Sequence, residues 1–108
     1  MNEQYMVIDI AGTIERLHLP EAMIQNLIKK TLDSDMLENA NQAFLAGDLA
    51  QAQQAIHTIK GTAANVGLAG LSQLALEIEL KIKENQYLDF TLFKVMQEVW
   101  STLKNNNS

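Results

Sequence analysis

The sequence predicts an all-α fold, an antiparallel four-helix bundle with an additional short N-terminal helix. Apolar residues recur at helical spacing along almost the whole chain. One proline and five glycines among 108 residues leave few positions for turns. With 47% hydrophobic residues, a chain of this length can form the core of one domain. We therefore expect a single domain over residues 1–104 and a disordered polar tail over residues 105–108.

The first predicted helices are short or interrupted. Apolar positions predict a helix over residues 7–17, which would cap the bundle. Pro20 follows at a first-turn position, where proline is favoured, and starts a second helix that continues towards Phe44. The sequence Asp-Ser-Asp at 33–35 leaves open whether this second helix is interrupted or continuous.

Three longer helices are expected in the rest of the chain. Gly47 ends the second helix, Asp48 is placed to cap the third, and Gly67 ends the third. The apolar stripe of the third helix has spacings of three and four residues. It consists of Leu49, Ala52, Ile56, Ile59 and Ala63. Further apolar faces predict helices over residues 69–85 and 92–103.

Composition excludes several functional classes. The chain has no cysteine for disulfides, thiol catalysis or thiolate metal sites, and its two histidines cannot form a multi-histidine metal site. A net charge of −5 argues against nucleic-acid binding. No segment approaches the ~20 apolar residues of a membrane span, and the first residues lack the basic region of a secretory signal. We therefore expect a cytoplasmic domain without metal or cofactor that binds neither nucleic acid nor membrane.

The middle of the chain is poor in charge, because residues 40–75 carry only Asp48 and Lys60 as charged groups. Such a stretch is expected to be buried or to face a partner. His57 lies within it, about 120° from the centre of the apolar stripe at about 100° per residue, so it is expected on a solvent-reachable flank. The other histidine, His18, falls in a predicted loop and is interpreted as a solvated residue without a role.

Four residues with uncharged side chains share the flank of His57. They are Ala50, Gln53, Gly61 and Ala64, which we call the flank patch. A glycine inside a helix costs about 1 kcal/mol relative to alanine, and Gly61 lies at i+4 from His57. Close approach of a partner to the imidazole would offset this cost. Spacing alone equally allows Gly61 to admit a neighbouring helix of the bundle, with His57 merely solvated.

A longer motif contains these residues. Residues 55–67 read Ala-Ile-His-Thr-Ile-Lys-Gly-Thr-Ala-Ala-Asn-Val-Gly, and Leu71, Leu74 and Ile78-Glu79 follow. This segment closely resembles the histidine-containing phosphotransfer (HPt) family, whose motif is a histidine, lysine-glycine at the third and fourth positions after it, small residues, a second glycine and a Leu…Leu…Leu-Glu helix. The resemblance is strong over residues 55–79 and extends as helix pattern to residues 20–54.

The resemblance implies a role for each matching residue. His57 would be the phosphoacceptor, Lys60 would stabilise the phosphoryl group beside it, and Gly61 would keep the approach open. The residue types suit this chemistry, because an unperturbed histidine has a pKa of about 6.5 and its neutral ring is a nucleophile. Ile59 conservatively replaces the family's usual leucine. Glu79 matches the family's acid, but a helix-surface carboxylate is usually solvated, and its reach to His57 stays open.

The resemblance also implies a function in multistep two-component phosphorelays. The protein would relay a phosphoryl group between receiver-domain aspartates through a phosphohistidine, with response-regulator receiver domains and a hybrid histidine kinase as partners. It would be a monomeric carrier without autokinase activity, consistent with the lack of a Gly-x-x-x-x-Gly-Lys-Ser/Thr loop. The alternatives are an interaction module that binds a receiver or kinase without carrying phosphate, and a purely structural bundle. The cognate partners and the direction of phosphoryl flow stay open.

Overall fold

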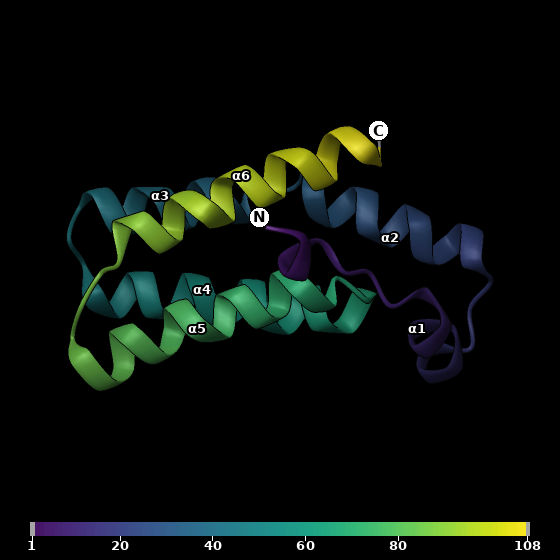
Figure 1. Cartoon of the computed structure of the whole chain (residues 1–108), viewed down its shortest axis with the longest axis horizontal. Helices are drawn as coiled ribbons and strands as arrows, with labels where there is room; N and C mark the ends of the chain where they lie inside the picture. The colour runs from purple at the N-terminus through teal and green to yellow at the C-terminus, as the bar shows by residue number, and fades with distance from the viewer. Residues whose placement is uncertain (1, 108) are drawn as a thin grey trace.

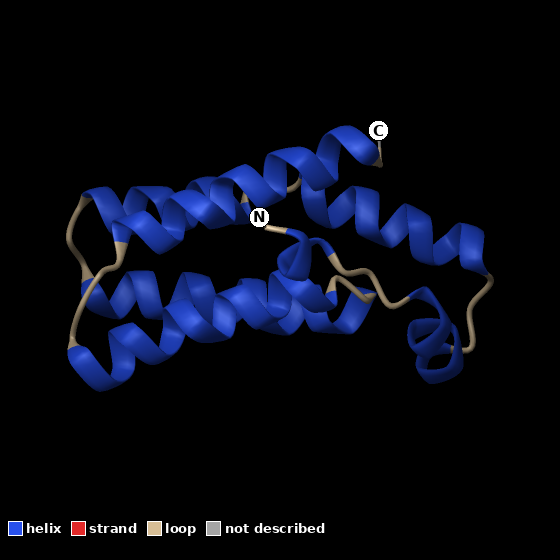
Figure 2. Cartoon of the chain, in the orientation of Figure 1, coloured by secondary structure: helices blue, strands red, loops and turns tan. Residues whose placement is uncertain are grey.

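The computed structural model describes residues 2–107, and over these residues it is all-helical without a strand, as the sequence predicts (Figures 1 and 2). A short 3-10 helix, η1, precedes six α-helices. Their bounds are η1 Glu3–Met6, α1 Ile10–Leu17, α2 Glu21–Asp33, α3 Met36–Leu45, α4 Leu49–Val66, α5 Ala69–Asn85 and α6 Phe90–Asn106. The α2–α3 pair runs beside α6 in one layer, and α4 and α5 form the other layer (Figure 1). Successive long helices run in opposite directions, which gives the antiparallel bundle.

The second predicted helix is interrupted, which settles the question left open at residues 33–35. Ser34 has an extended backbone, and its hydroxyl donates a 2.6 Å hydrogen bond to the carbonyl of Thr31. The indole nitrogen of Trp100 donates to the carbonyl of Leu32 at 2.9 Å. The side chains of the C-cap residue Ser34 and of Trp100 on α6 thus donate to two of the carbonyls at the end of α2, where the helix itself supplies no further donors.

The core lies between the two layers and takes one face from each long helix. Four of the five residues in the predicted stripe of α4 are fully buried, and Leu49 is half-buried. The ring of Phe44 on α3 stacks on that of Phe93 on α6, with centroids 4.2 Å apart. Because this apolar face is fixed, the opposite face of α4 and its flanks remain available to solvent or to a partner.

The N-terminal segment differs from its prediction. The helix expected over residues 7–17 begins only at Ile10, with the carboxylate of Asp9 accepting from the amide of Gly12. Residues 7–9 are instead extended across the α4–α5 turn, where Gly70 donates to the carbonyl of Val7 and Asp9 donates to that of Gly67. These tertiary hydrogen bonds outweigh the local helical pattern. The expected cap is present, because α1 covers one end of the bundle (Figure 1).

Three helix ends also shift from their predicted positions. Pro20 is the N-cap of α2 rather than a residue of its first turn, and α6 begins at Phe90 because Asp89 caps it. The prediction of a disordered tail from residue 105 is wrong for its first two residues, since α6 continues through Asn106. The amide side chain of Asn107 donates to the carbonyl of Leu103 and caps that end. Ser108, also assigned to the tail, lies outside the described residues.

We expect Gly70→Ala to destabilise the protein, although alanine is the better helix former. A Cβ at this position would collide with the backbone carbonyl group of Tyr5, which belongs to η1 and cannot move as a side chain does. The expected loss is about 1–3 kcal/mol in the free energy of unfolding, the usual range for overpacking. A thermal melt measures it, and limited proteolysis reports whether residues 2–9 detach. Gly61→Ala is the matched control, and equal melting temperatures for the two variants would contradict the prediction.

Candidate functional site

His57 projects from the exposed flank of α4, where the sequence predicts it. Its side chain is 58% exposed, whereas its neighbours Ile56 and Ile59 are buried. Asp48 caps the first turn of α4 by accepting from the amide of Gln51 at 3.0 Å, and Gly67 ends the helix in the left-handed conformation. The helix is therefore fixed at both ends, and its rotation about its own axis is set by the buried stripe.

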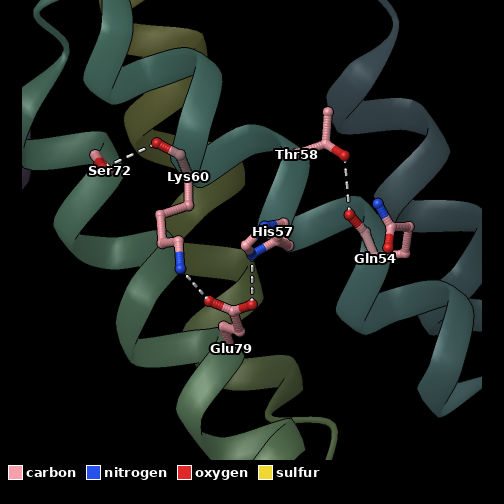
Figure 3. Close-up of polar contacts among 6 residues, drawn as sticks. All are labelled: Gln54, His57, Thr58, Lys60, Ser72 and Glu79. Atoms are coloured by element: carbon pink, nitrogen blue, oxygen red, sulfur yellow. Dashed lines mark hydrogen bonds and ion pairs between the residues drawn. The ribbon is translucent and has the colours of Figure 1, made fainter.

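A buried carboxylate of α5 holds both His57 and Lys60 (Figure 3). The Oε2 atom of Glu79 lies 2.8 Å from Nδ1 of His57, and its Oε1 atom accepts from Nζ of Lys60 at 2.6 Å. Glu79 is only 3% exposed, and the side chain of Lys60 is 29% exposed. We call these three residues the His57–Lys60–Glu79 cluster.

The sequence left open whether Glu79 reaches His57, and the structure shows that it does, with a carboxylate that is buried rather than solvated as is usual on a helix surface. Glu79 follows Ala75 by four residues and precedes Ile82 by three, and both of these residues are in the core. This spacing places Glu79 at the edge of the buried face of α5. The burial of Glu79 could therefore have been predicted from the spacing of apolar residues in α5. Its contacts with α4 could not, because they depend on how the two helices pack.

The cluster keeps Glu79 ionised. Burial by itself raises the pKa of this carboxyl, but hydrogen bonds from Lys60 and His57, together with the electrostatic attraction between the carboxylate and these two groups, outweigh burial and bring the pKa below its ordinary value of 4.5. A carboxylate only accepts hydrogen bonds, so the geometry assigns the ring proton to Nδ1 of His57. The other ring nitrogen, Nε2, then carries the lone pair on the solvent side.

The lowered pKa of Glu79 predicts acid sensitivity. Since its pKa is lower in the folded protein than in the unfolded chain, ionised Glu79 stabilises the fold above about pH 4.5, and this contribution is lost as pH falls towards the folded-state pKa. The difference in melting temperature between wild type and Glu79→Gln should therefore shrink as pH is lowered from 7 towards 3. Thermal melts across this range measure it, and a difference that stays constant would contradict the prediction.

The flank patch surrounds the cluster. Ala50 and Gln53 line a hollow of about 360 Å³ together with Gln54, His57, Glu79 and Lys83. Ala64 lies beside Lys60 at a second hollow of about 250 Å³. Gly61 is exposed, and a Cβ built on it would meet nothing within 4 Å. The alternative in which Gly61 admits a neighbouring helix is therefore wrong, and all four patch residues border the exposed surface around the cluster.

Other groups in the described part of the chain add no second site of this kind. His18 is exposed and ends α1 as its C-cap, with a left-handed backbone at φ 54°. Within residues 2–107, no three metal-ligating side chains lie together. None of the described helices is long and apolar enough to cross a membrane.

The fold and site together define a helical bundle built around one exposed histidine, whose ring is held by a buried carboxylate. A family model described as Hpt domain matches residues 23–104, most of the chain, so the chain belongs to the histidine-containing phosphotransfer family. Members of this family are phosphocarrier modules that act with receiver domains and histidine kinases in phosphorelays. No curated protein and no solved structure gives a significant match. The N-terminal segment, including η1 and α1, lies outside the matched region.

Proposed function

We propose that His57 is the phosphoacceptor of this protein and relays a phosphoryl group between aspartates of response-regulator receiver domains. The observation that carries the proposal is the 2.8 Å contact between its Nδ1 atom and the buried carboxylate of Glu79. This contact orients the ring and places the lone pair of Nε2 towards solvent. A nucleophile that must reach an atom in another protein needs this combination of fixed orientation and exposure.

The transfer step follows from this arrangement. The lone pair of Nε2 attacks the phosphorus of an aspartyl phosphate, a P–N bond forms, and the P–O bond breaks with its electron pair left on the aspartate carboxylate. The proton stays on Nδ1, so the phosphorylated ring carries a positive charge. Glu79 faces that charge and stabilises it electrostatically. Reversal of the same step returns the phosphoryl group to a second receiver.

Lys60 has two roles in this proposal. Its ammonium group holds Oε1 of Glu79 at 2.6 Å, which leaves Oε2 for the imidazole. It also places a positive charge beside the phosphoryl group, as cationic groups do in other phosphoryl transfers. Lys60 is thus both a positioning residue for the ring, through Glu79, and a stabiliser of the transferring group.

The flank patch is the proposed docking surface for the receiver domain. Gly61 presents no side chain, and Ala50 and Ala64 present only methyl groups, so a partner surface can approach Nε2 of His57 closely.

We propose a monomeric, cytoplasmic carrier that relies on the kinase for ATP-dependent phosphorylation and on the receiver for the aspartate. A hybrid histidine kinase is the expected source of the phosphoryl group.

A direct phosphorylation assay tests the proposal. Incubation with phosphorylated receiver domains should transfer label to the protein as an acid-labile, alkali-stable phosphate, the behaviour of a phosphoramidate. Peptide mapping under alkaline conditions should place the label on His57. Binding of receivers without any label transfer would instead support the interaction module that carries no phosphate.

A further inference from the structure

We propose that Lys83 is a second cation of this site and holds the phosphoryl group once it is attached to His57. The inference rests on the proposed function, because it concerns the phosphorylated form of the same histidine. It assigns to Lys83 a ground-state role, the stabilisation of the phosphorylated protein relative to the phosphorylated receiver.

The first reason is that Lys60 shares its positive charge between Glu79 and the phosphoryl group. Its Nζ atom lies 2.6 Å from Oε1 of Glu79, and Glu79 also holds the ring of His57. After transfer, the ring is positive and faces Glu79, while the phosphoryl group on the opposite nitrogen carries about two negative charges. Within the cluster, the single negative charge of Glu79 faces the positive charges of both the ring and Lys60, which leaves one positive charge to set against the phosphoryl group. A phosphoryl group with about two negative charges therefore still has about one that the cluster does not offset.

The second reason is the position of Lys83. It lies four residues after Glu79 on α5, which places both side chains on the same helix face. Lys83 lines the same hollow as His57, and the amide side chains of Gln53 and Gln54 complete the walls. A lysine side chain is long and flexible, so its ammonium group can swing over this hollow towards a group on Nε2.

The third reason is that Lys83 is not committed elsewhere among the described residues. Three other lysines lie in ion pairs, Lys29 with Asp33, Lys81 with Asp89 and Lys104 with Asp33, and among the described lysines without one, Lys83 is the one that lines the hollow of His57. No ion pair or hydrogen bond of the Lys83 ammonium group occurs in the structure of residues 2–107. An exposed ammonium beside the acceptor histidine is free to bind an incoming anion.

A structural explanation of Lys83 makes a different prediction. Lys83 lies in the last turn of α5, where a positive charge interacts favourably with the helix dipole. If this were its only role, Lys83→Gln would lower the melting temperature slightly and leave the phosphorylated protein unaffected. The helix dipole acts equally on the phosphorylated and unphosphorylated protein, so a purely structural role leaves the phosphotransfer equilibrium unchanged. A role in holding the phosphoryl group changes that equilibrium, and its measurement therefore distinguishes the two explanations.

The experiment measures this equilibrium. A receiver that phosphorylates the wild-type protein is mixed with it at concentrations where little complex forms, and label is partitioned between the two proteins until the ratio is constant. Docking affinity does not enter this ratio, because it does not alter the free energies of the separated proteins. Lys83→Gln should shift the ratio towards the phosphorylated receiver by about three- to tenfold, as expected for a charged hydrogen bond at an exposed site.

Two further variants sharpen the test. Lys83→Arg keeps the charge and should restore most of the wild-type ratio. Lys94→Gln removes one positive charge from the exposed surface of α6 and should leave the ratio unchanged. An unchanged ratio in Lys83→Gln, or an equal shift in Lys94→Gln, would overturn the role of Lys83. If the wild type takes no phosphate from any receiver, the proposed function itself fails, which is a distinguishable result.

Discussion

Replacing His57 by glutamine is expected to abolish phosphorylation of the protein while leaving its fold intact. No other described side chain combines an exposed nucleophilic nitrogen with a fixed ring orientation. The side chain of His57 is 58% exposed, and substitutions at such positions usually change stability by no more than ~0.5 kcal/mol. The glutamine amide can donate to Glu79 as Nδ1 does, so the buried carboxylate keeps a partner. Label transfer from a phosphorylated receiver and a thermal melt of the same sample measure both parts.

His18→Gln is the matched control for this prediction. His18 is exposed and forms the left-handed C-cap of α1, so it shares the residue type of His57 but not the carboxylate or the flank patch. This variant should accept phosphate at the wild-type rate. Acid-labile phosphate that persists on His57→Gln, or that disappears from His18→Gln, would refute the assignment of His57.

Gly61→Gln is expected to raise the stability of the isolated protein and to block receiver binding. Glutamine is the better helix former, and a Cβ at position 61 meets nothing within 4 Å, so the gain should be roughly 0.5–1 kcal/mol. In a domain of this size, such a gain corresponds to an increase of several degrees in melting temperature. The same side chain projects from the surface one turn beyond His57, where it would hold a docking partner away.

Two measurements together decide this prediction. A thermal melt reports the stability, and a titration with a receiver domain reports the binding. Ser101→Gln, an exposed substitution of similar bulk on α6, serves as the control and should bind the receiver normally. A Gly61→Gln variant that melts higher but binds as wild type would remove Gly61 from the docking surface. A clearly lower melting temperature would show that position 61 is packed within the protein.

The helical pattern of the sequence predicted several features of the site correctly. The spacing of Ile56, Ile59 and Ala63 defines the buried face of α4 and hence the exposed flank of His57. Local signals at the ends of α4, an aspartate cap and a glycine in the left-handed conformation, were equally readable. These predictions succeeded because they depend on residues within about one or two helical turns of each other, where geometry is nearly fixed.

The N-terminal segment shows where this local reasoning fails. Residues 7–9 have apolar spacing that suits a helix, yet they are extended because their backbone pairs with Gly67 and Gly70 at the α4–α5 turn. Those partners are about sixty residues away in sequence. A helix beginning at Val7 would lose these two hydrogen bonds, and no local pattern reports them.

The sequence by itself therefore determined the all-helical class, the bundle, the exposed flank of His57 and the family motif around it. Only the tertiary structure decided that Glu79 is buried, that it holds His57 and Lys60 at once, and that Gly61 faces open space. The physical reason is the range of the interactions. Periodicity orients side chains about their own helix axis, whereas the distance between a carboxylate on α5 and an imidazole on α4 depends on how closely, and in which register, the two helices pack.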